Sequence, residues 1–197
     1  MTVIVATKNA HKVSEMQALL SDIPNLSLIT VTQAGIDADI EENGTTFEEN
    51  ALIKARTVCA LSHMPALADD SGLSVDALYG EPGIYSARYA SENGENASDE
   101  QNIEKLLRKL AAIPSGERTA RFVSALALVF PDGREYVTKG ICEGHITSEV
   151  RGNGGFGYDP VFFCPKFGKT FGELSPEEKN SVSHRNSSVL QMKPHLR

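Results

Sequence analysis

The chain has 197 residues, of which 41% are hydrophobic and 23% charged, as in ordinary globular proteins. Its formal net charge of −7 and pI of about 5.3 argue against a general nucleic-acid binder, which needs a basic surface. No apolar stretch approaches the roughly 20 residues that cross a bilayer, so we expect neither a nucleic-acid nor a membrane partner.

The N-terminus and the cysteines both predict a cytoplasmic protein. Residues 1–6 contain neither a basic stretch nor a small-residue cleavage site, so we expect no secretory signal. The three cysteines, at positions 59, 142 and 164, are scattered and odd in number. They match no metal-binding spacing and no disulfide framework, so we expect reduced thiols.

Strands and helices alternate early in the chain, and a hairpin follows. Apolar runs predict strands at residues 3–6, 26–31, 66–68, 121–130, 134–146 and 158–163. Apolar residues at helical spacing predict helices at residues 13–23, 45–62 and 98–112, and a further helical segment is expected from Ser175 through Arg185. We therefore expect an α/β fold, a single elongated two-lobed domain over residues 1–197 with a mixed sheet flanked by helices.

Polar residues next to the apolar patterns predict where these helices begin and end. Thr45 and Thr46, each followed three residues later by a glutamate, offer two alternative capping boxes. Ser98 and Gln101 are cap candidates for the next helix. Pro194 is expected to end the last helix early, because proline cannot continue a helix.

Two apparent phosphate-binding motifs lack a feature that each motif requires. Residues 152–157 match G-x-G-x-x-G, but a β-prone segment containing Pro160 follows where the dinucleotide motif needs a helix. Residues 168–170 resemble the end of a P-loop, but Phe163 stands where the first glycine should be. Two interpretations of residues 152–157 remain: a flexible turn, or a loop whose backbone approaches a ligand closely.

Two pairs of adjacent acids are candidates for a cation site. Asp69 and Asp70 directly follow the third predicted strand, and Glu41 and Glu42 lie in the loop before the second helix. Carboxylates at strand ends suit Mg²⁺, which prefers oxygen ligands and often shares substrate phosphates. From composition alone, a turn with solvated acids is the favoured interpretation of residues 69–72, because Asp, Ser and Gly are common turn formers.

Basic residues gather at three places in this acidic chain. Residues 7–12 join a strand to a helix N-terminus, where exposed amides and the helix dipole favour phosphate, and Lys8 and Lys12 add positive charge there. Lys54 lies on an apolar stretch of its helix. Lys179 and the Ser183-His184-Arg185 run could supply donors to an oxygen-bearing ligand.

Taken together and in order, these segments resemble the inosine triphosphate pyrophosphatase family, specifically its bacterial dITP/XTP pyrophosphatases. The resemblance rests on residues 7–12, 41–51, 68–73, 82–89, 155–160, 178–179 and 183–185, and it runs from about residue 3 to residue 185. Asn186 departs from the pattern, since a small residue is usual there, and the tail that follows is more polar than expected.

The resemblance implies hydrolysis of non-standard purine nucleoside triphosphates (dITP, ITP and XTP or dXTP) to the monophosphate and pyrophosphate, with Mg²⁺. It implies that Asp70 is the general base, that Glu41 or Glu42 binds the metal with Asp70, and that Asp69 supports the metal shell. Lys54 is expected to assist the residues that hold the phosphate chain, which are Thr7, Lys8, Asn9, Ala10, His11 and Lys12.

The resemblance also implies how the base is selected. Phe156 would stack on the purine, and Gly157, Tyr158 and Asp159 would complete that wall. The base edge would be faced by Lys179, His184 and Arg185, with Ser71 and Arg88 as further contacts. Donors there would favour a 6-oxo base over adenine, whose 6-amino group would leave them unpaired.

Two other functions are compatible with parts of the sequence. A Maf-like nucleotide pyrophosphatase would act on modified or pyrimidine nucleoside triphosphates, although residues 156–159 and 183–185 argue against it. A non-catalytic nucleotide-binding protein would not release pyrophosphate.

The family resemblance also implies a homodimer.

Overall fold

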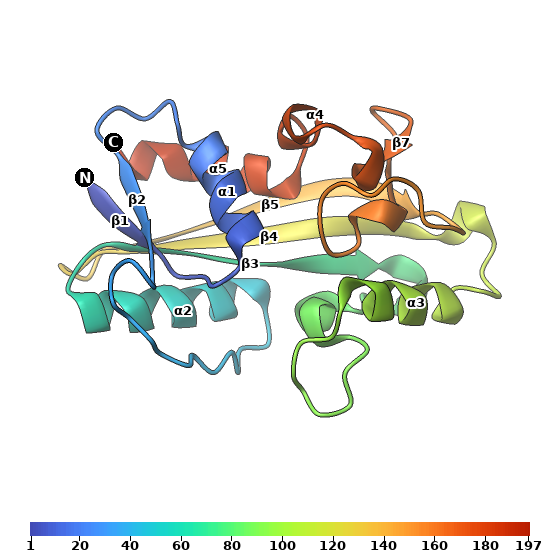
Figure 1. The fold of residues 1–197 in the computed structure, drawn as a ribbon, viewed down its shortest axis with the longest axis horizontal. Coiled ribbons are helices and arrows are strands. Elements are labelled where there is room, and N and C mark those ends of the chain that lie inside the picture. Colours follow the sequence, from blue (N-terminus) through green and yellow to red (C-terminus); the bar gives the residue numbers. More distant parts are fainter. The chain divides into compact units, whose positions relative to one another are not determined.

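A computed structural model describes residues 1–197 and contains one seven-stranded sheet with the strand order β2-β1-β3-β4-β5-β6-β7. The strands are β1 (Thr2–Val5), β2 (Ser27–Thr30), β3 (Ala66–Val75), β4 (Thr119–Val129), β5 (Glu135–Ile146), β6 (Phe162–Cys164) and β7 (Lys169–Thr170). The α-helices are α1 (Ala10–Leu19), α2 (Phe47–Ser62), α3 (Asp99–Lys109), α4 (Pro176–Asn180) and α5 (His184–Met192) (Figure 1). The expected α/β class with a mixed sheet flanked by helices is confirmed.

The chain divides into two compact units. The first unit comprises Met1–Asp70, Ser124–Gly140 and His184–Arg197, and the second comprises Ser71–Val123 and Ile141–Ser183. Long strands contribute to both units, since β3 enters the second unit after Asp70. The single domain over residues 1–197 stays a prediction.

In the first unit, strand side chains alternate between two apolar cores. One core joins residues such as Val3, Val5 and Leu67 to Met16 of α1 and Val189 of α5. The other core is built from the intervening strand residues, and α2 packs against it with Ala51, Ala55 and Val58 among others. Because successive strand side chains point to opposite faces, α2 covers one face of these strands while α1 and α5 cover the other (Figure 1).

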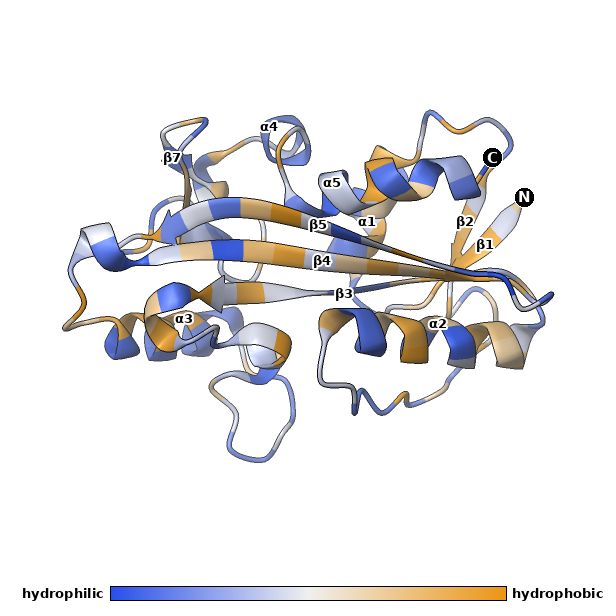
Figure 2. Ribbon diagram, turned by 180° about the vertical axis from the view of Figure 1, so that it is seen from behind, coloured by the Kyte–Doolittle hydropathy of each residue, from blue (hydrophilic) through white to orange (hydrophobic).

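The second unit has a core of its own. Leu73 and Val75 of β3 pack with Ile103 and Leu106 of α3, and Phe162 lies in the same cluster. Three phenylalanines form its centre: the ring of Phe162 lies 4.6 Å from Phe122 and 4.9 Å from Phe171. On both α2 and α3, bands of hydrophobic and hydrophilic residues follow one another along the helix (Figure 2).

Strand directions follow the expected division into parallel and antiparallel parts. β1 pairs in parallel with β2 and with β3, whereas β5 pairs antiparallel with β6 and β6 with β7. β4 and β5 are neighbours joined by the predicted turn, in which the Phe130 amide donates to the Arg134 carbonyl at 2.9 Å.

Two predicted strands differ from the structure. β3 does not end before Asp69 and Asp70 but continues through them to Val75, because cationic side chains, described below, neutralise both carboxylates inside the strand. Half of the predicted strand at residues 158–163 is a 3₁₀ turn over Asp159–Val161, where Pro160 lacks the amide that a sheet needs, and only Phe162–Cys164 forms β6.

The structure also decides the helix ends. α2 uses the second of the two alternative caps, with Thr46 as its N-cap, and α3 starts with the Ser98–Gln101 capping box. The helical segment from Ser175 is interrupted, since α4 ends at Asn180 and α5 begins at His184. As predicted, the last helix ends before Pro194. No helix combines the length and the hydropathy that crossing a bilayer would need.

Candidate active site

The first unit buries a charged network around Asp69, whose side chain is 0% exposed. Its Oδ1 accepts a hydrogen bond from the Ser124 hydroxyl at 2.7 Å. Its Oδ2 lies 2.8 Å from Lys12 Nζ and accepts a hydrogen bond from Arg185 Nη2 at 3.1 Å. Arg185 is itself fully buried, and its Nη1 donates to the carboxylate of Glu15 on α1.

This network keeps Asp69 ionised. Burial alone would raise the pKa of Asp69, but the positive charges of Arg185 and Lys12 outweigh it and hold the pKa well below its usual value. Both oxygens of Asp69 thus bind groups of the protein, and its expected part in the metal shell stays a prediction. These contacts tie together β3, α1 and α5, which carry Asp69, Lys12 and Arg185.

The second carboxylate of the doublet lies in a different environment. Asp70 Oδ1 accepts a hydrogen bond from Lys54 Nζ at 2.9 Å, and the same ammonium donates to Glu42 Oε2 at 3.0 Å. Asp70 Oδ2 is buried and has no hydrogen-bond donor. Glu42 is partly exposed, whereas the neighbouring Glu41 is exposed to solvent. Of the two expected alternatives, therefore, it is Glu42 that lies beside Asp70.

Asp70 and Glu42 differ in how readily each accepts a proton. Burial raises the pKa of Asp70 above its usual value, and the negative charge of Glu42 raises it further. The positive charges of Lys54 and Lys12 lower the pKa but do not outweigh these two effects. Burial also disfavours ionised Glu42, but Lys54 lowers the pKa of Glu42 below its usual value. Lys54, held by both acids, has a raised pKa although burial opposes its charge. Asp70 is therefore the carboxylate of the pair with the greater tendency to accept a proton.

The donor set here fits Mg²⁺. The structure gathers no group of three or more histidine, cysteine, aspartate or glutamate side chains able to hold a metal. Mg²⁺, however, is commonly bound by one or two carboxylates together with waters and substrate phosphates. The buried Asp70 Oδ2 without a donor and the nearby Glu42 carboxylate supply such a pair of oxygen ligands.

The loop at residues 7–12 reaches this network through Lys12. Asn9 is the N-cap of α1, and its Oδ1 accepts from the amides of His11 and Lys12 at 2.9 and 3.2 Å. Thr7 Oγ1 accepts from the Asn9 amide at 3.1 Å. These two side chains thus shape the loop by satisfying amides that were expected to face phosphate.

The remaining loop residues lie at the surface. Lys8, Ala10 and His11 are exposed, and Lys8 pairs with Asp37 at 3.2 Å. That pair is open to solvent on both sides and is therefore weak, so it leaves the Lys8 charge accessible to an anion.

Close packing of β5 against α5 positions Arg185. A Cβ at Gly140 would lie 2.0 Å from the His184 carbonyl, so only glycine allows α5 to approach this closely. Thr138 then donates to the Ser188 carbonyl at 2.9 Å. His184 is buried at the start of α5. Arg185, expected at the base edge, instead has both terminal nitrogens bound to Asp69 and Glu15.

The residues expected to select a base form a cluster of their own in the second unit. Asp159 Oδ2 accepts from the Phe156 amide at 2.9 Å and from Lys179 Nζ at 2.6 Å, and both partners of this ion pair are buried. Lys179 Nζ also lies 4.6 Å from the centre of the Phe156 ring, a cation–π contact. The Tyr158 hydroxyl donates to the Ser86 carbonyl at 2.8 Å.

Lys179 and Asp159 therefore neutralise each other instead of both standing free for a ligand. The two further base contacts that were expected also lie in the second unit: Ser71 is partly exposed in β3, and Arg88 stacks on Tyr85.

Comparison with known proteins identifies the family. The model of the Ham1 family matches residues 3–195. The chain belongs to the Ham1 family. It is 47% identical over 194 residues to the dITP/XTP pyrophosphatase of Leuconostoc mesenteroides, covering 98% of this chain and 94% of that protein. It is 50% identical over 189 residues to the dITP/XTP pyrophosphatase of Halalkalibacterium halodurans, covering 96% and 95%.

Solved structures agree with this assignment and confirm the resemblance drawn from the motifs. The Ham1 protein of Staphylococcus aureus is similar with a TM-score of 0.87 at 41% identity, covering 100% of this chain and 98% of that one. A HAM1 protein from Coxiella burnetii gives a TM-score of 0.88 at the same 41% identity and the same coverage.

Two residues of this Ham1 site were missed by the sequence analysis. Glu15 follows Lys12 by three positions on α1, a spacing that puts both on one face of a helix. Ser124 is a polar residue inside the apolar run that forms β4, and it accepts or donates a 2.9 Å hydrogen bond with Ser188 as well as binding Asp69. Helical spacing for Glu15 and isolated polarity for Ser124 were signals that could have revealed both.

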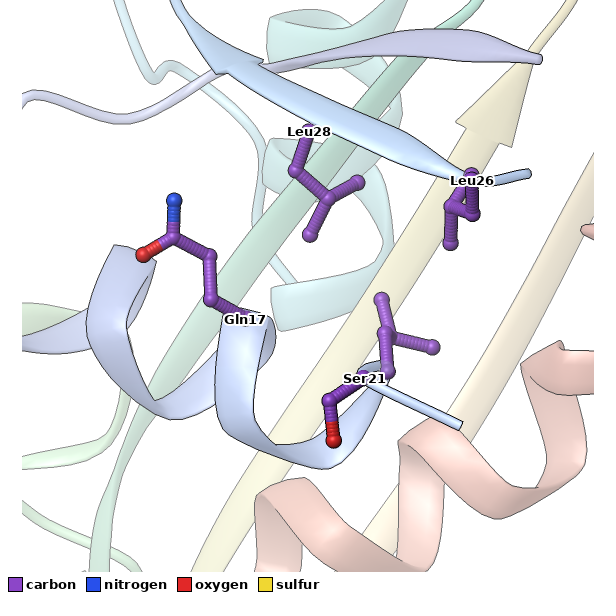
Figure 3. A pocket seen from close by; sticks show the side chains of 5 residues that line it. Gln17, Ser21, Leu26 and Leu28 are labelled. Atoms are coloured by element: carbon purple, nitrogen blue, oxygen red, sulfur yellow. The ribbon is translucent and has the colours of Figure 1, made fainter. Parts of the chain in front are cut away.

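A small pocket in the first unit of this Ham1 chain lies elsewhere. It has a volume of about 120 Å³ and is formed between α1 and β2 by Gln17, Leu20, Ser21, Leu26 and Leu28 (Figure 3). None of these residues belongs to the charged network. The volume is also below the roughly 300 Å³ from which small-molecule sites start.

Proposed function

We propose that the chain hydrolyses non-standard purine nucleoside triphosphates, namely dITP, ITP and XTP or dXTP, to the monophosphate and pyrophosphate. Curated relatives that share about half of its residues are named dITP/XTP pyrophosphatases. The observation that carries the proposal is the arrangement around Asp70, where a buried carboxylate oxygen without a donor lies beside Glu42 and Lys54. Such an enzyme removes damaged nucleotides from the cellular pool.

The chemistry proposed for the chain's own residues follows from charge. A triphosphate carries about four negative charges, so a carboxylate can act beside it only where cations offset the repulsion. Lys54 holds Asp70 through Oδ1, and the Asp70 carboxylate is proposed to accept a proton from the water that attacks the α-phosphorus, through the oxygen that does not bind the metal. The bond between the α- and β-phosphates then breaks, and pyrophosphate leaves. Lys12 and Lys8 are proposed to bind the phosphate chain.

Mg²⁺ is the proposed cofactor, with Asp70 and Glu42 as its protein ligands. When bound, it supplies charge neutralisation and polarises the phosphate oxygens. Asp69 is proposed to act indirectly, by holding Lys12 and the adjacent strand in place.

The proposed metal role of Glu42 has a matched control in its neighbour. We expect Glu42→Gln to weaken Mg²⁺ binding at least about tenfold, since it removes a charged oxygen ligand. Glu41→Gln should change Mg²⁺ affinity less than twofold, because Glu41 is exposed and lies outside the Lys54 contacts. Calorimetric titration of each variant with Mg²⁺ tests this directly. Equal losses in both variants, or a larger loss in Glu41→Gln, would contradict the assignment.

A nucleotide panel tests the proposed substrates. We expect dITP, ITP and XTP to be preferred over dATP and dGTP by at least about a hundredfold in kcat/KM, the scale of two or three discriminating hydrogen bonds. The aromatic loop of the second unit is proposed to recognise the base. The measurement is pyrophosphate release with and without Mg²⁺. Equal rates on dATP would defeat the selectivity, and release of single phosphates would defeat the reaction.

The same panel separates the two alternative functions. A Maf-like enzyme would prefer modified or pyrimidine triphosphates, and a binding protein would bind nucleotide without releasing pyrophosphate. We further propose that the protein is a cytoplasmic homodimer, for which light scattering at varied concentration is the test of assembly.

A further inference from the structure

The loop that carries Phe156 has a shape that only certain residues permit. Gly155 has φ +74°, and a Cβ there would lie 2.0 Å from Asp159 Oδ2. Gly157 has φ +60°, in the left-handed region that glycine favours. Phe156 therefore sits between two residues of unusual backbone conformation, so the direction of its ring depends on what holds the loop (residues 155–159).

The Phe156 end of this loop is held by Asp159 of the same loop and by Lys179. Asp159 accepts from the Phe156 amide, and Lys179 neutralises Asp159 while contacting the Phe156 ring. Among these three residues, no contact reaches the next amide, that of Gly157.

The Gly157 amide is held by a residue distant in the sequence. It donates to Asp99 Oδ2 at 2.6 Å, although the two residues are 58 positions apart. Asp99 is the first residue of α3, but Ser98 and Gln101 already cap that helix. Asp99 is also exposed, so it adds nothing to the apolar core. Its hydrogen bond to the loop is therefore what distinguishes it from Glu100, the other acid in the first turn of α3.

We propose that Asp99 is a positioning residue that holds the Phe156 loop in the shape that recognises a purine base. Two successive amides, those of Phe156 and Gly157, are bound by the carboxylates of Asp159 and Asp99. Hydrogen bonds to a charged acceptor are stronger than neutral ones, so this pair restrains the backbone on both sides of the Phe156 Cα. The inference rests on the proposed function, because it assumes that the loop meets the base.

The test compares a ligand that has a base with one that has none. Equilibrium binding of ITP and of inorganic tripolyphosphate, both without Mg²⁺ so that ITP is not hydrolysed, is measured for the wild type, Asp99→Ala and Asp99→Asn. Glu100→Ala is the matched control, since Glu100 is a first-turn acid of the same helix whose carboxylate bonds with Ser98 and with its own backbone.

We expect Asp99→Ala to weaken ITP binding about tenfold, the effect of losing one charge-assisted hydrogen bond, while tripolyphosphate binding stays within twofold. Asp99→Asn keeps an acceptor oxygen and should recover part of the loss. Hydrogen exchange at the Gly157 amide, followed by NMR, should accelerate in Asp99→Ala and not in Glu100→Ala.

Several results would overturn the inference. They are unchanged ITP affinity in Asp99→Ala, equal losses for ITP and tripolyphosphate, or a Glu100→Ala variant that behaves in the same way. A wild type that binds ITP no more tightly than tripolyphosphate would also overturn it. If ITP binds with this pattern and pyrophosphate is not released, the proposed reaction fails and the role of Asp99 stands.

Discussion

Replacing Asp70 by asparagine is expected to reduce pyrophosphate release by at least about a thousandfold, within the range that general bases contribute. Asparagine has almost the same shape and its carbonyl oxygen can still accept from Lys54, but it cannot take a proton from water. Because burial already raises the pKa of Asp70, a neutral side chain at this position should not destabilise the fold. Nucleotide binding should remain measurable. Single-turnover kinetics and calorimetric titration with ITP together check both expectations.

An exposed aspartate in the same unit provides the control. Asp22 pairs with Lys193 at 2.7 Å and is 60% exposed, so Asp22→Asn should leave turnover within twofold. Substantial hydrolysis by Asp70→Asn would remove Asp70 from the role of base. A variant that fails to fold would show instead that the carboxylate at position 70 is required for stability, contrary to the expectation above.

The largest expected effect on stability comes from Arg185. We expect Arg185→Leu to lower the free energy of unfolding by about 3–5 kcal/mol, because it removes a main counter-charge of the fully buried Asp69 and also the ion pair of Arg185 with Glu15. Leucine keeps the buried position apolar, so the loss would reflect charge more than volume. Urea denaturation of the wild type and the variant measures the difference.

Two further variants show whether charge is the cause. Arg56 forms an ion pair with Glu135 at 2.7 Å but is 56% exposed, so Arg56→Leu should cost no more than about 1 kcal/mol. Adding Asp69→Asn to Arg185→Leu removes the uncompensated charge and should recover part of the lost stability. If Arg185→Leu costs no more than Arg56→Leu, or if the double variant is less stable still, the network does not stabilise the fold in this way.

Patterns within a few residues of each other predicted much of the architecture. The strand and helix around residues 7–12 are present, and so are the Thr46 N-cap of α2, the capping box of α3 and the hairpin at residues 131–133. These features depend on periodicity, caps and turn residues, whose causes are local. The order of the motifs was also sufficient to indicate the family.

The sequence could not show how the two adjacent aspartates differ. Asp69 and Asp70 have the same chemistry and the same neighbours in the chain, and both were expected in a loop near a metal. The structure places them in a strand, where successive side chains point in opposite directions. Asp69 therefore contacts Lys12 and Arg185, whereas Asp70 contacts Lys54, which also binds Glu42.

By itself, the sequence determined the fold class, most elements and most of the residues that carry charge into the site, although not Glu15. Only the tertiary structure decided which charges meet, because Arg185 reaches Asp69 across 116 positions and Asp99 reaches Gly157 across 58. Burial patterns along a chain report which face of an element is apolar. They contain no information about which distant cation neutralises a buried acid, and that pairing determines the charge state of each carboxylate.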